Sequence, residues 1–486
     1  MYRREDPNQM YLEDFKLQFG GKLRADNRWV KLSKHMPWEK IDEIYAQNFS
    51  PDSGAAAISS RIAFGSIYAK ENEEWTDRET VQCFIENPYF QYFLGISEFQ
   101  DQPPFDPSMM VHFRKRFSKE AINEINELIF LSAACEAEKN KDDTPKSEGG
   151  GSPPNDTEDD GELPKNKGKL ILDATCAPSD IRYPTDLSLL NEARENTEKI
   201  IDILRPPSQA QIRKNNRERK KARNEFLAII KQKRPGIRKI RAAIKKQLKY
   251  LKRNIDFIDE FLCKNGFDSL EKKYFRRFMT ICDLYHQQST MYKNNTHQCK
   301  ERIVSLRQPH VRPIARGKAG KKYEFGQKMA LSVVGGYTFI EKQQFENFNE
   351  GLLLIESVRR YKDRFGFYPV AVIADQIYRN QRNIRFCKKH GIRISGSKLG
   401  KPEIPEFLND QEYQDYCERN IVEGRIGISK RRFGLDLIMC YLPETALTEA
   451  ALQVLCTNFS VWLCFLFSFF QKLTPRFYFF RFSFAR

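Results

Sequence analysis

Two short apolar runs, each closed by an aspartate, constrain the fold more than any other feature of the sequence. The apolar run in LILDAT ends at Asp173, and the apolar run in YPVAVIAD ends at Asp375. Runs of this length and composition are typical of buried strands. We expect each strand to deliver a carboxylate at its C-terminal end, where ligand crevices form in α/β sheets. An aspartate after a strand is also a common turn former or helix cap, so this position alone leaves its role open.

The segments that flank the second run predict the rest of a sheet. ALSVV, the pair Gly335-Gly336 and YTFI predict a β-hairpin. An amphipathic helix is expected over residues 349–361, and a further strand at GIRISG. The order of these elements indicates an α/β domain whose sheet has an antiparallel start.

A long interval separates the two aspartates, because Asp375 lies 202 positions after Asp173. This is more than a hairpin and a helix require, so we expect an insertion over about residues 187–310. Within it, residues 211–255 contain 18 Lys and Arg against two acids. Apolar residues recur there every three or four positions, which predicts a long helical hairpin broken at Pro235-Gly236. Its cations are expected to follow nucleic-acid phosphates, with simple solvation as the alternative.

The stretch YCERNIVEGRIGISK places four different polar groups, a phenol, a guanidinium, a carboxylate and an ammonium, on one side of an expected helix. At 100° per residue, Tyr416, Arg419, Glu423 and Lys430 fall within an arc of about 60°. A carboxylate flanked by cations suits a hard metal ion beside a phosphate backbone. The alternative is a solvated helix face with i,i+4 ion pairs, and two glycines in the stretch weaken the helix prediction.

The N-terminal residues 1–135 have helical periodicity and predict a small all-α domain. Within it, MMVHFRKRF predicts a short helix after a turn, which would project Arg114, Lys115 and Arg116. Such a basic helix suits a DNA groove, although an ordinary surface helix is an equally good interpretation.

Composition shifts mark the remaining boundaries. Residues 136–168 are rich in Gly, Pro, Ser and acids and predict a flexible linker. The late apolar run VLCTNFSVWLCFLFSFF is short for a membrane span and contains polar residues, which favours a buried helix. Residues 473–486 form an aromatic and basic tail.

The charge balance of the 486-residue chain favours a polyanionic partner, either nucleic acid or an anionic membrane surface. The chain has 81 Lys and Arg against 64 Asp and Glu, a net charge of +17. Its eleven Cys contain no CxxC pair and its six His no ligand spacing, which excludes an obvious zinc site or disulfide framework. A charged N-terminus without an apolar core argues against secretion, so we expect a cytoplasmic protein, associated with the nucleoid if bacterial.

The acids and the helical stretch together resemble a known family. Asp173, Asp375 and Glu423, with the pattern Tyr416-x2-Arg419-x3-Glu423-x6-Lys430, are similar to the DDE transposases of bacterial insertion sequences that carry a Y-x2-R-x3-E-x6-K signature. All four signature positions match with the right spacing. Five further stretches resemble the same family: ENPYFQYFLG, FDPSMMVHFRKRF, RPIARGK, YEFGQK and NFNEG.

The resemblance implies a ribonuclease H-like catalytic domain over residues 169–472, with the helical insertion inside it. It also implies that the all-α domain before it binds DNA at the terminal inverted repeats of the element. The activity implied is metal-dependent DNA cleavage and strand transfer. The partners implied are the element ends and target DNA, with a homodimer in the assembled complex and no membrane.

The resemblance also implies roles for single residues. Asp173, Asp375 and Glu423 would be the catalytic acids and would hold two divalent ions, Mg²⁺ or Mn²⁺. Tyr416 and its signature cations Arg419 and Lys430 would contact DNA phosphates near the cut end.

Three other functions stay open on the sequence. The first is a catalytically inactive, transposase-derived DNA-binding protein, and the second is another ribonuclease H-like nuclease. The third is a membrane-surface protein, which is disfavoured because the basic run lies inside a long insertion and not beside the apolar segment.

Overall fold

The structure is a computed structural model in which the chain forms two compact units. It describes residues 2, 11–17, 20–50, 53–142, 166–204, 209–315, 323–395 and 410–473. The first unit comprises Met1–Pro178, Lys328–Gln344 and Phe348–Arg486. The second unit comprises Ser179–Gln327 and Phe345–Asn347.

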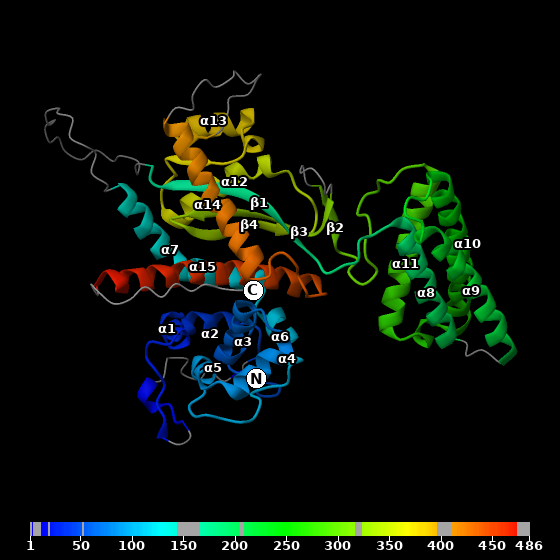
Figure 1. The fold of residues 1–486 in the computed structure, drawn as a ribbon, viewed down its shortest axis with the longest axis horizontal. Helices are drawn as coiled ribbons and strands as arrows, with labels where there is room; N and C mark the ends of the chain where they lie inside the picture. The colour runs from blue at the N-terminus through cyan, green and yellow to red at the C-terminus, as the bar shows by residue number, and fades with distance from the viewer. Residues whose placement is uncertain are drawn as a thin grey trace. The chain divides into compact units, whose positions relative to one another are not determined.

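The N-terminal part of the first unit is helical, as predicted (Figure 1). Its elements are η1 (Leu12–Asp14), α1 (Arg28–His35), α2 (Trp38–Ala46), α3 (Ser60–Glu73), α4 (Asp77–Glu86), α5 (Pro88–Phe93), α6 (Met109–Arg116) and α7 (Lys119–Asp142). Side-chain caps fix several starts: Ser59 caps α3, Thr76 and Glu79 form a capping box at α4, and Asn87 caps α5. Helix α7 extends into the start of the predicted linker, and residues 143–165 lie outside the described residues.

A mixed sheet forms the centre of the first unit. Strand β1 (Lys169–Pro178) pairs with β3 (Tyr323–Val334) on one side and β5 (Ala371–Ile373) on the other, and β5 pairs with β6 (Arg393–Ile394). The pairs β1–β5 and β5–β6 are parallel, whereas β3 and β4 (Tyr337–Gln344) form the predicted antiparallel hairpin. The hairpin turns at Gly335 and Gly336, which have φ values of 57° and 88° that favour glycine. The α/β prediction is therefore confirmed in outline.

Helices and short turns surround this sheet. They are η4 (Glu350–Leu352), α12 (Leu354–Phe365), η5 (Gln376–Tyr378), α13 (Gln381–Lys389) and α14 (Asp410–Arg432). Helix α14 runs unbroken through its two glycines and packs on β1 and β5 (Figure 1). The contact is apolar, because Ile171, Ile373 and Val333 of the sheet form one buried cluster with Val422 of α14.

The late apolar run lies in helix α15 (Pro443–Leu473), which packs against α3, α7 and β4. The prediction of a buried helix is confirmed for residues 454–459 of the run, whereas the side chains of residues 465–470 lie outside the described part. The contacts of the buried Asn458 explain why a polar residue is found in this apolar sequence. The side chain accepts a hydrogen bond from the backbone N–H of Thr338 at 2.8 Å and donates to its carbonyl at 2.7 Å, so it satisfies the backbone of strand β4. Within the described part of the chain, no helix has the length and apolarity of a membrane span.

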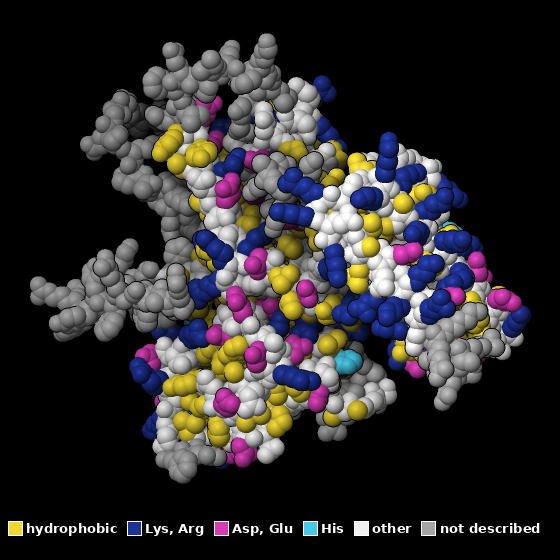
Figure 2. Space-filling view, turned by 45° about the vertical axis from the view of Figure 1, so that its right-hand side comes forward, with side chains coloured by type: hydrophobic (Ala, Val, Ile, Leu, Met, Phe, Trp, Pro, Cys, Tyr) yellow, Lys and Arg dark blue, Asp and Glu magenta, His cyan; other side chains and the backbone are white. Residues whose placement is uncertain are grey.

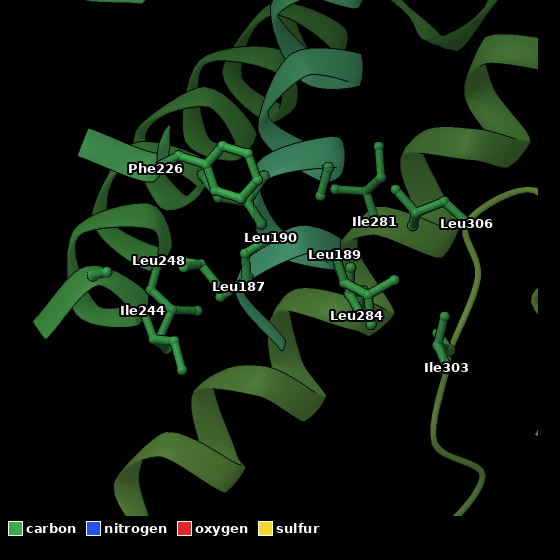
Figure 3. Close-up of a cluster of buried hydrophobic side chains, with 13 residues drawn as sticks. Leu187, Leu189, Leu190, Phe226, Ile244, Leu248, Ile281, Leu284, Ile303 and Leu306 are labelled. Carbon is green, nitrogen blue, oxygen red and sulfur yellow. The ribbon is translucent and has the colours of Figure 1, made fainter. Parts of the chain in front are cut away.

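The second unit contains the predicted helical insertion. Its main helices are α8 (Asp186–Leu204), α9 (Gln209–Ile230), α10 (Ile237–Asn265) and α11 (Lys272–Lys293), with the 3-10 turn η3 (Phe267–Ser269) before α11. The break between α9 and α10 falls at Pro235-Gly236, as predicted. Leu187, Leu190, Phe226, Leu248 and Leu284 lie in one buried apolar cluster that holds the helices together (Figure 3). A short antiparallel pair, β2 (Arg312–Ala315) with residues 323–326 of β3, completes the unit.

Candidate active site

The register of two parallel strands brings Asp173 and Asp375 to equivalent positions. Ile171 of β1 lies opposite Ile373 of β5, and each aspartate follows its isoleucine by two residues. Because side chains alternate along an extended chain, each aspartate projects to the same face as its isoleucine. One part of the prediction is wrong: β1 does not end at Asp173 but continues to Pro178. Asp173 instead lies just past the residues that pair with β5.

Helix α14 covers that face and places Glu423 beside the aspartates. Val422 of α14 is fully buried in one cluster with Ile171 and Ile373, whereas the adjacent Glu423 is half exposed. The acid therefore stands at the border between the packed helix and solvent. The three predicted acids come from β1, from the turn after β5, and from α14.

Arg419 links two of these acids. Its guanidinium donates to Asp375 and also pairs with Glu423, with 3.1 Å between Nη2 and Oε1. The second pair is the i,i+4 pair that the helical spacing predicts. All three side chains are partly exposed, so each ion pair contributes little to stability, typically less than about 1 kcal/mol. Among the described contacts, Arg419 thus pairs with the acids that the resemblance assigns to metal.

The carboxyl group of Asp173 has a raised pKa. Burial raises its pKa to about 6, while a hydrogen bond from the backbone N–H of Ala174 at 2.7 Å opposes the shift. The negative charges of Asp375, Glu350 and Glu423 raise the pKa further. Four carboxylates therefore act on one region, which favours the binding of a cation there.

Asp173→Asn is expected to stabilise the metal-free protein at neutral pH. The pKa of Asp173 in the folded protein, about 6, lies above its ordinary value of 3.8, so the folded state binds this proton more tightly than the unfolded state. The wild-type free energy of unfolding should then fall as pH rises from about 4 to about 6 and level off above that. The stabilisation by Asn should approach on the order of 2 kcal/mol at neutral pH and shrink toward acid.

Thermal unfolding of both proteins in a chelator, followed from acid to neutral pH, measures this difference. A variant that is less stable than wild type at neutral pH, or a difference that does not change with pH, would contradict the assignment.

Glu350, the fourth acid, was not among the site residues predicted from the sequence. It begins η4, and its carboxylate pairs with the buried ammonium of Lys328 at 2.7 Å. The same ammonium donates to the carbonyl of Phe348 at 2.8 Å. The segment NFNEG, which contains Glu350, carried the family resemblance and was the available signal.

The other residues predicted to contact DNA differ from one another in how far their side chains are exposed. Tyr416 is exposed on α14 and Lys430 is half-buried on the same helix. On α6, Lys115 is exposed, whereas Arg116 is half-buried and donates to the hydroxyl of Tyr45 at 3.0 Å.

The prediction that Arg114 projects from α6 is wrong. Its side chain is 5% exposed and forms two hydrogen bonds with Asp77, at 2.8 and 2.7 Å. This bidentate pair ties α6 to the start of α4, because a buried guanidinium requires a carboxylate partner. Arg114 therefore has a structural role in the N-terminal helices.

The donor chemistry at the acids fits a hard divalent cation, since carboxylate oxygens are the ligands that Mg²⁺ and Mn²⁺ prefer. The guanidinium between Asp375 and Glu423 is itself a cation held by these two groups. Nevertheless, among the described residues no group of three or more His, Cys, Asp or Glu is arranged to hold a metal ion. A divalent ion at Asp375 and Glu423 would compete with the guanidinium of Arg419 for the same carboxylate oxygens.

Comparisons with known proteins agree with this picture. Residues 372–460, which include Asp375 and the four signature positions, match the family described as "Transposase DDE domain". Residues 18–116 match "Transposase domain (DUF772)". The chain is 30% identical over 164 residues to "Uncharacterized protein ORF8 in nfe locus" of Rhizobium meliloti, across 34% of this chain and 68% of the relative. No solved structure matches the chain.

Both matches are to transposase families. One match covers the helical N-terminal part, and the other covers Asp375 and Glu423, two of the three acids. The chain belongs to the DDE transposases of insertion sequences. The resemblance found in the sequence is thereby confirmed.

Proposed function

We propose that this transposase is catalytically active: it binds the terminal inverted repeats of its element, cleaves the DNA with divalent metal ions, and transfers the cut strands to target DNA. The observation that carries the proposal is the register of β1 and β5, which aligns Asp173 with Asp375 on the face covered by α14 and Glu423. An alignment of this kind is unnecessary for turn formers or helix caps, the other common role of these aspartates.

The proposed architecture follows the resemblance. Residues 169–472 would form a ribonuclease H-like catalytic domain, and the helical residues before it would form the DNA-binding domain. The mixed sheet, with an antiparallel hairpin beside parallel strands, supports the first assignment. The match of residues 18–116 to a transposase domain supports the second.

Divalent metal ions are general cofactors of this family. In this chain Asp173, Asp375 and Glu423 would hold them, and the ions would supply activation of the attacking water and stabilisation of the leaving oxygen. Asp173 carries a raised pKa, and its proton must be absent for it to serve as a ligand, so metal binding should weaken below about pH 6.

The cations of α14 would hold the DNA. Arg419 would exchange its ion pairs with Asp375 and Glu423 for a DNA phosphate, which would free both acids. The exposed phenol of Tyr416 and the ammonium of Lys430 lie on the same helix and would contact the backbone near the cut end. Because no covalent intermediate is required, Tyr416 is assigned as a DNA contact.

The proposed partners are the element ends and target DNA, with two copies of the chain acting together because two ends must be cut. The substrate for the test is DNA that carries the short inverted repeats expected to flank the gene. Purified protein with such ends and Mg²⁺ is expected to give cleaved and then joined products. Binding without any metal-dependent cleavage would identify an inactive DNA-binding protein, and cleavage without preference for the repeats would identify another nuclease.

A further inference from the structure

The charge of the second unit is unevenly distributed among its helices. The span of α9 and α10, residues 209–265, contains 19 Lys and Arg against five Asp and Glu, whereas α8 contains two against five. Figure 2 shows Lys and Arg side chains crowded over this helical unit at the right of the view. The unit is therefore basic on α9 and α10 and acidic on α8.

The few acids near α9 and α10 are already paired within the unit. Glu218 pairs with Arg253 at 2.9 Å, and Glu225 accepts from Lys246 at 3.0 Å and from the hydroxyl of Tyr250 at 2.9 Å. These contacts join α9 to α10. Within α10, Lys252 also pairs with Asp256, and Lys264 pairs with Glu260.

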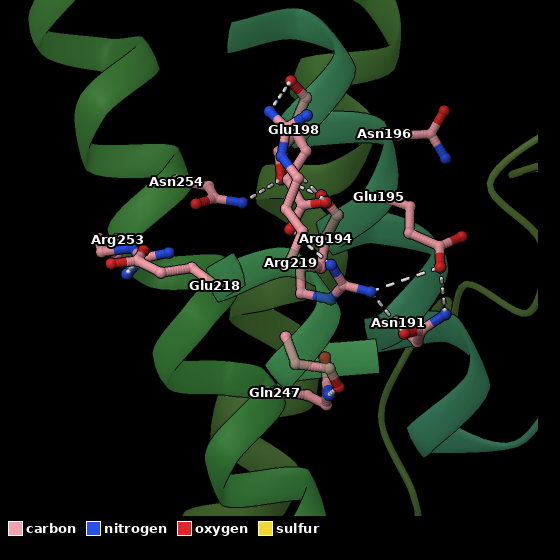
Figure 4. Close-up of polar contacts among 12 residues, drawn as sticks. Asn191, Arg194, Glu195, Asn196, Glu198, Glu218, Arg219, Gln247, Arg253 and Asn254 are labelled. Atoms are coloured by element: carbon pink, nitrogen blue, oxygen red, sulfur yellow. Dashed lines mark hydrogen bonds and ion pairs between the residues drawn. The ribbon is translucent and has the colours of Figure 1, made fainter. Parts of the chain in front are cut away.

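A further pair joins α9 to α8, since Arg219 donates to Asp202 with two hydrogen bonds of 2.8 Å. Figure 4 shows Arg219 beside Glu198 and the buried Arg194, and Glu198 pairs with both cations. Glu198 and Asp202 of α8 are therefore engaged by cations other than the outer ones of α9 and α10.

The remaining cations define what we call the basic surface. Its eleven members are exposed, and none has an ion pair within the described part of the chain. They are Arg217, Lys220, Lys221, Arg223, Lys231, Lys233, Arg234, Arg238, Lys239, Lys245 and Lys249.

Three cations of the basic surface, which we call the ridge, lie along one side of α10. Arg238, Lys245 and Lys249 are spaced by seven and four residues, so they lie within an arc of about 40° on one side of the helix. Ile244 and Leu248 turn toward the buried cluster instead (Figure 3). The apolar core holds the helices, and the ridge cations are not needed to fold them.

Such a surface is unfavourable unless a polyanion neutralises it. Like charges four residues apart, as at Lys245 and Lys249, destabilise a helix by roughly 0.2–0.5 kcal/mol. A phosphate backbone removes this repulsion and releases condensed counterions when it binds. Ridge cations of this kind neutralise phosphates without reading base sequence.

We propose that the basic surface of α9 and α10 binds the phosphate backbone of duplex DNA without sequence preference. It would be a second DNA-binding surface, made of residues other than those of the acidic site. The proposal rests on the proposed function for the identity of the polyanion but not for the cleavage chemistry. A binding experiment on the full chain in a chelator therefore tests it whether or not the protein cleaves DNA.

The test compares two triple variants of equal charge. Arg238→Gln, Lys245→Gln and Lys249→Gln together remove the ridge, and Lys264→Gln, Lys272→Gln and Lys273→Gln remove three exposed cations elsewhere in the same unit. Fluorescence anisotropy with a labelled duplex of random sequence, over a series of salt concentrations, gives the affinity and its salt slope. Circular dichroism confirms that both variants are folded.

The ridge variant is expected to lower the slope of log affinity against log salt by about 2 to 3, and to weaken binding on the order of 10²-fold at low salt. The control variant should leave both nearly unchanged. A second triple, Lys220→Gln, Lys221→Gln and Arg223→Gln on α9, should act like the ridge variant.

Four results would overturn the proposal. The first is an unchanged slope in the ridge variant, and the second is an equal loss in the control, which would show a general charge effect. The third is a loss of binding to single-stranded RNA or to anionic phospholipid vesicles with duplex binding intact, which would assign another partner. The fourth is weakening confined to inverted-repeat duplexes, whereas equal weakening for inverted-repeat and random duplexes supports a backbone contact.

Discussion

Asp173→Asn, Asp375→Asn and Glu423→Gln are each expected to reduce strand cleavage by at least about 10³-fold, which corresponds to about 4 kcal/mol of transition-state stabilisation. Each change removes one negative oxygen ligand from a site that must neutralise two divalent ions and still leave room for the substrate. Affinity for the element ends should stay within about twofold, because the proposed phosphate contacts are made by other residues. Cleavage of a labelled end and anisotropy with the same DNA measure the two quantities separately.

Glu356→Gln is the matched control. Glu356 is an exposed acid on α12, in the same unit, and it pairs with Arg360 four residues later at 2.8 Å. Glu356 is not one of the acids of the proposed site, so the Glu356→Gln variant should cleave DNA at the wild-type rate. Metal-dependent cleavage that survives in any one of the three site variants would remove that acid from the catalytic set.

Asp173→Asn combines this loss with the gain in stability at neutral pH described above. A residue retained for chemistry at a cost in folding free energy has this signature, since a buried carboxylate is destabilising when charged. A purely structural aspartate would give the opposite sign. The two measurements on one variant therefore separate a functional role from a structural one.

Local patterns in the sequence were sufficient for the elements that carry the site. Short apolar runs gave β1 and β5, and the helical spacing of Arg419 and Glu423 gave the i,i+4 pair on α14. The break at Pro235-Gly236 fixed the insertion hairpin because proline cannot continue a helix. These features depend on neighbours within a few residues, which the sequence displays directly.

Features that depend on long-range pairing were not predictable. Arg114 looked exposed because its partner Asp77 lies 37 residues away, and only the fold brings the two together. The continuation of β1 beyond Asp173 was hidden by a polar residue inside a strand. The polar residues of the late apolar run favoured a buried helix, but the backbone partner of Asn458 in strand β4 could not be predicted, because it lies 120 residues away.

Gly351 is a second position at which the structure predicts a large effect on catalysis. A Cβ added there would lie 2.4 Å from the carbonyl oxygen of Ile377, in the turn that Asp375 begins. The carbonyl of Gly351 also accepts hydrogen bonds from Asn380 and Asn383, at 2.9 and 2.7 Å. The turns η4 and η5 are therefore locked together at a backbone contact that only glycine permits.

Gly351→Ala is expected to push η5 away from η4 and to displace Asp375 with it. Overpacking at a fixed backbone contact costs typically 1–3 kcal/mol, so Tm should fall. Misplacement of a catalytic group by about 1 Å can cost on the order of 10²-fold in rate. Cleavage should therefore drop by about that factor, even well below Tm, while end binding is retained.

Gly424→Ala supplies the control with the opposite sign. Gly424 lies inside α14 beside Glu423, and a Cβ there would meet no heavy atom within 4 Å outside the neighbouring backbone of its own helix. Alanine should stabilise the helix by up to about 1 kcal/mol and leave the cleavage rate unchanged. If both alanine variants lost cleavage alike, or if Gly351→Ala cleaved normally, the close packing of η4 on η5 would not be what positions Asp375. A loss confined to Gly351→Ala would support a position of Asp375 fixed by backbone contact, because each variant adds one methyl group, at Gly351 against the carbonyl of Ile377 and at Gly424 into open space.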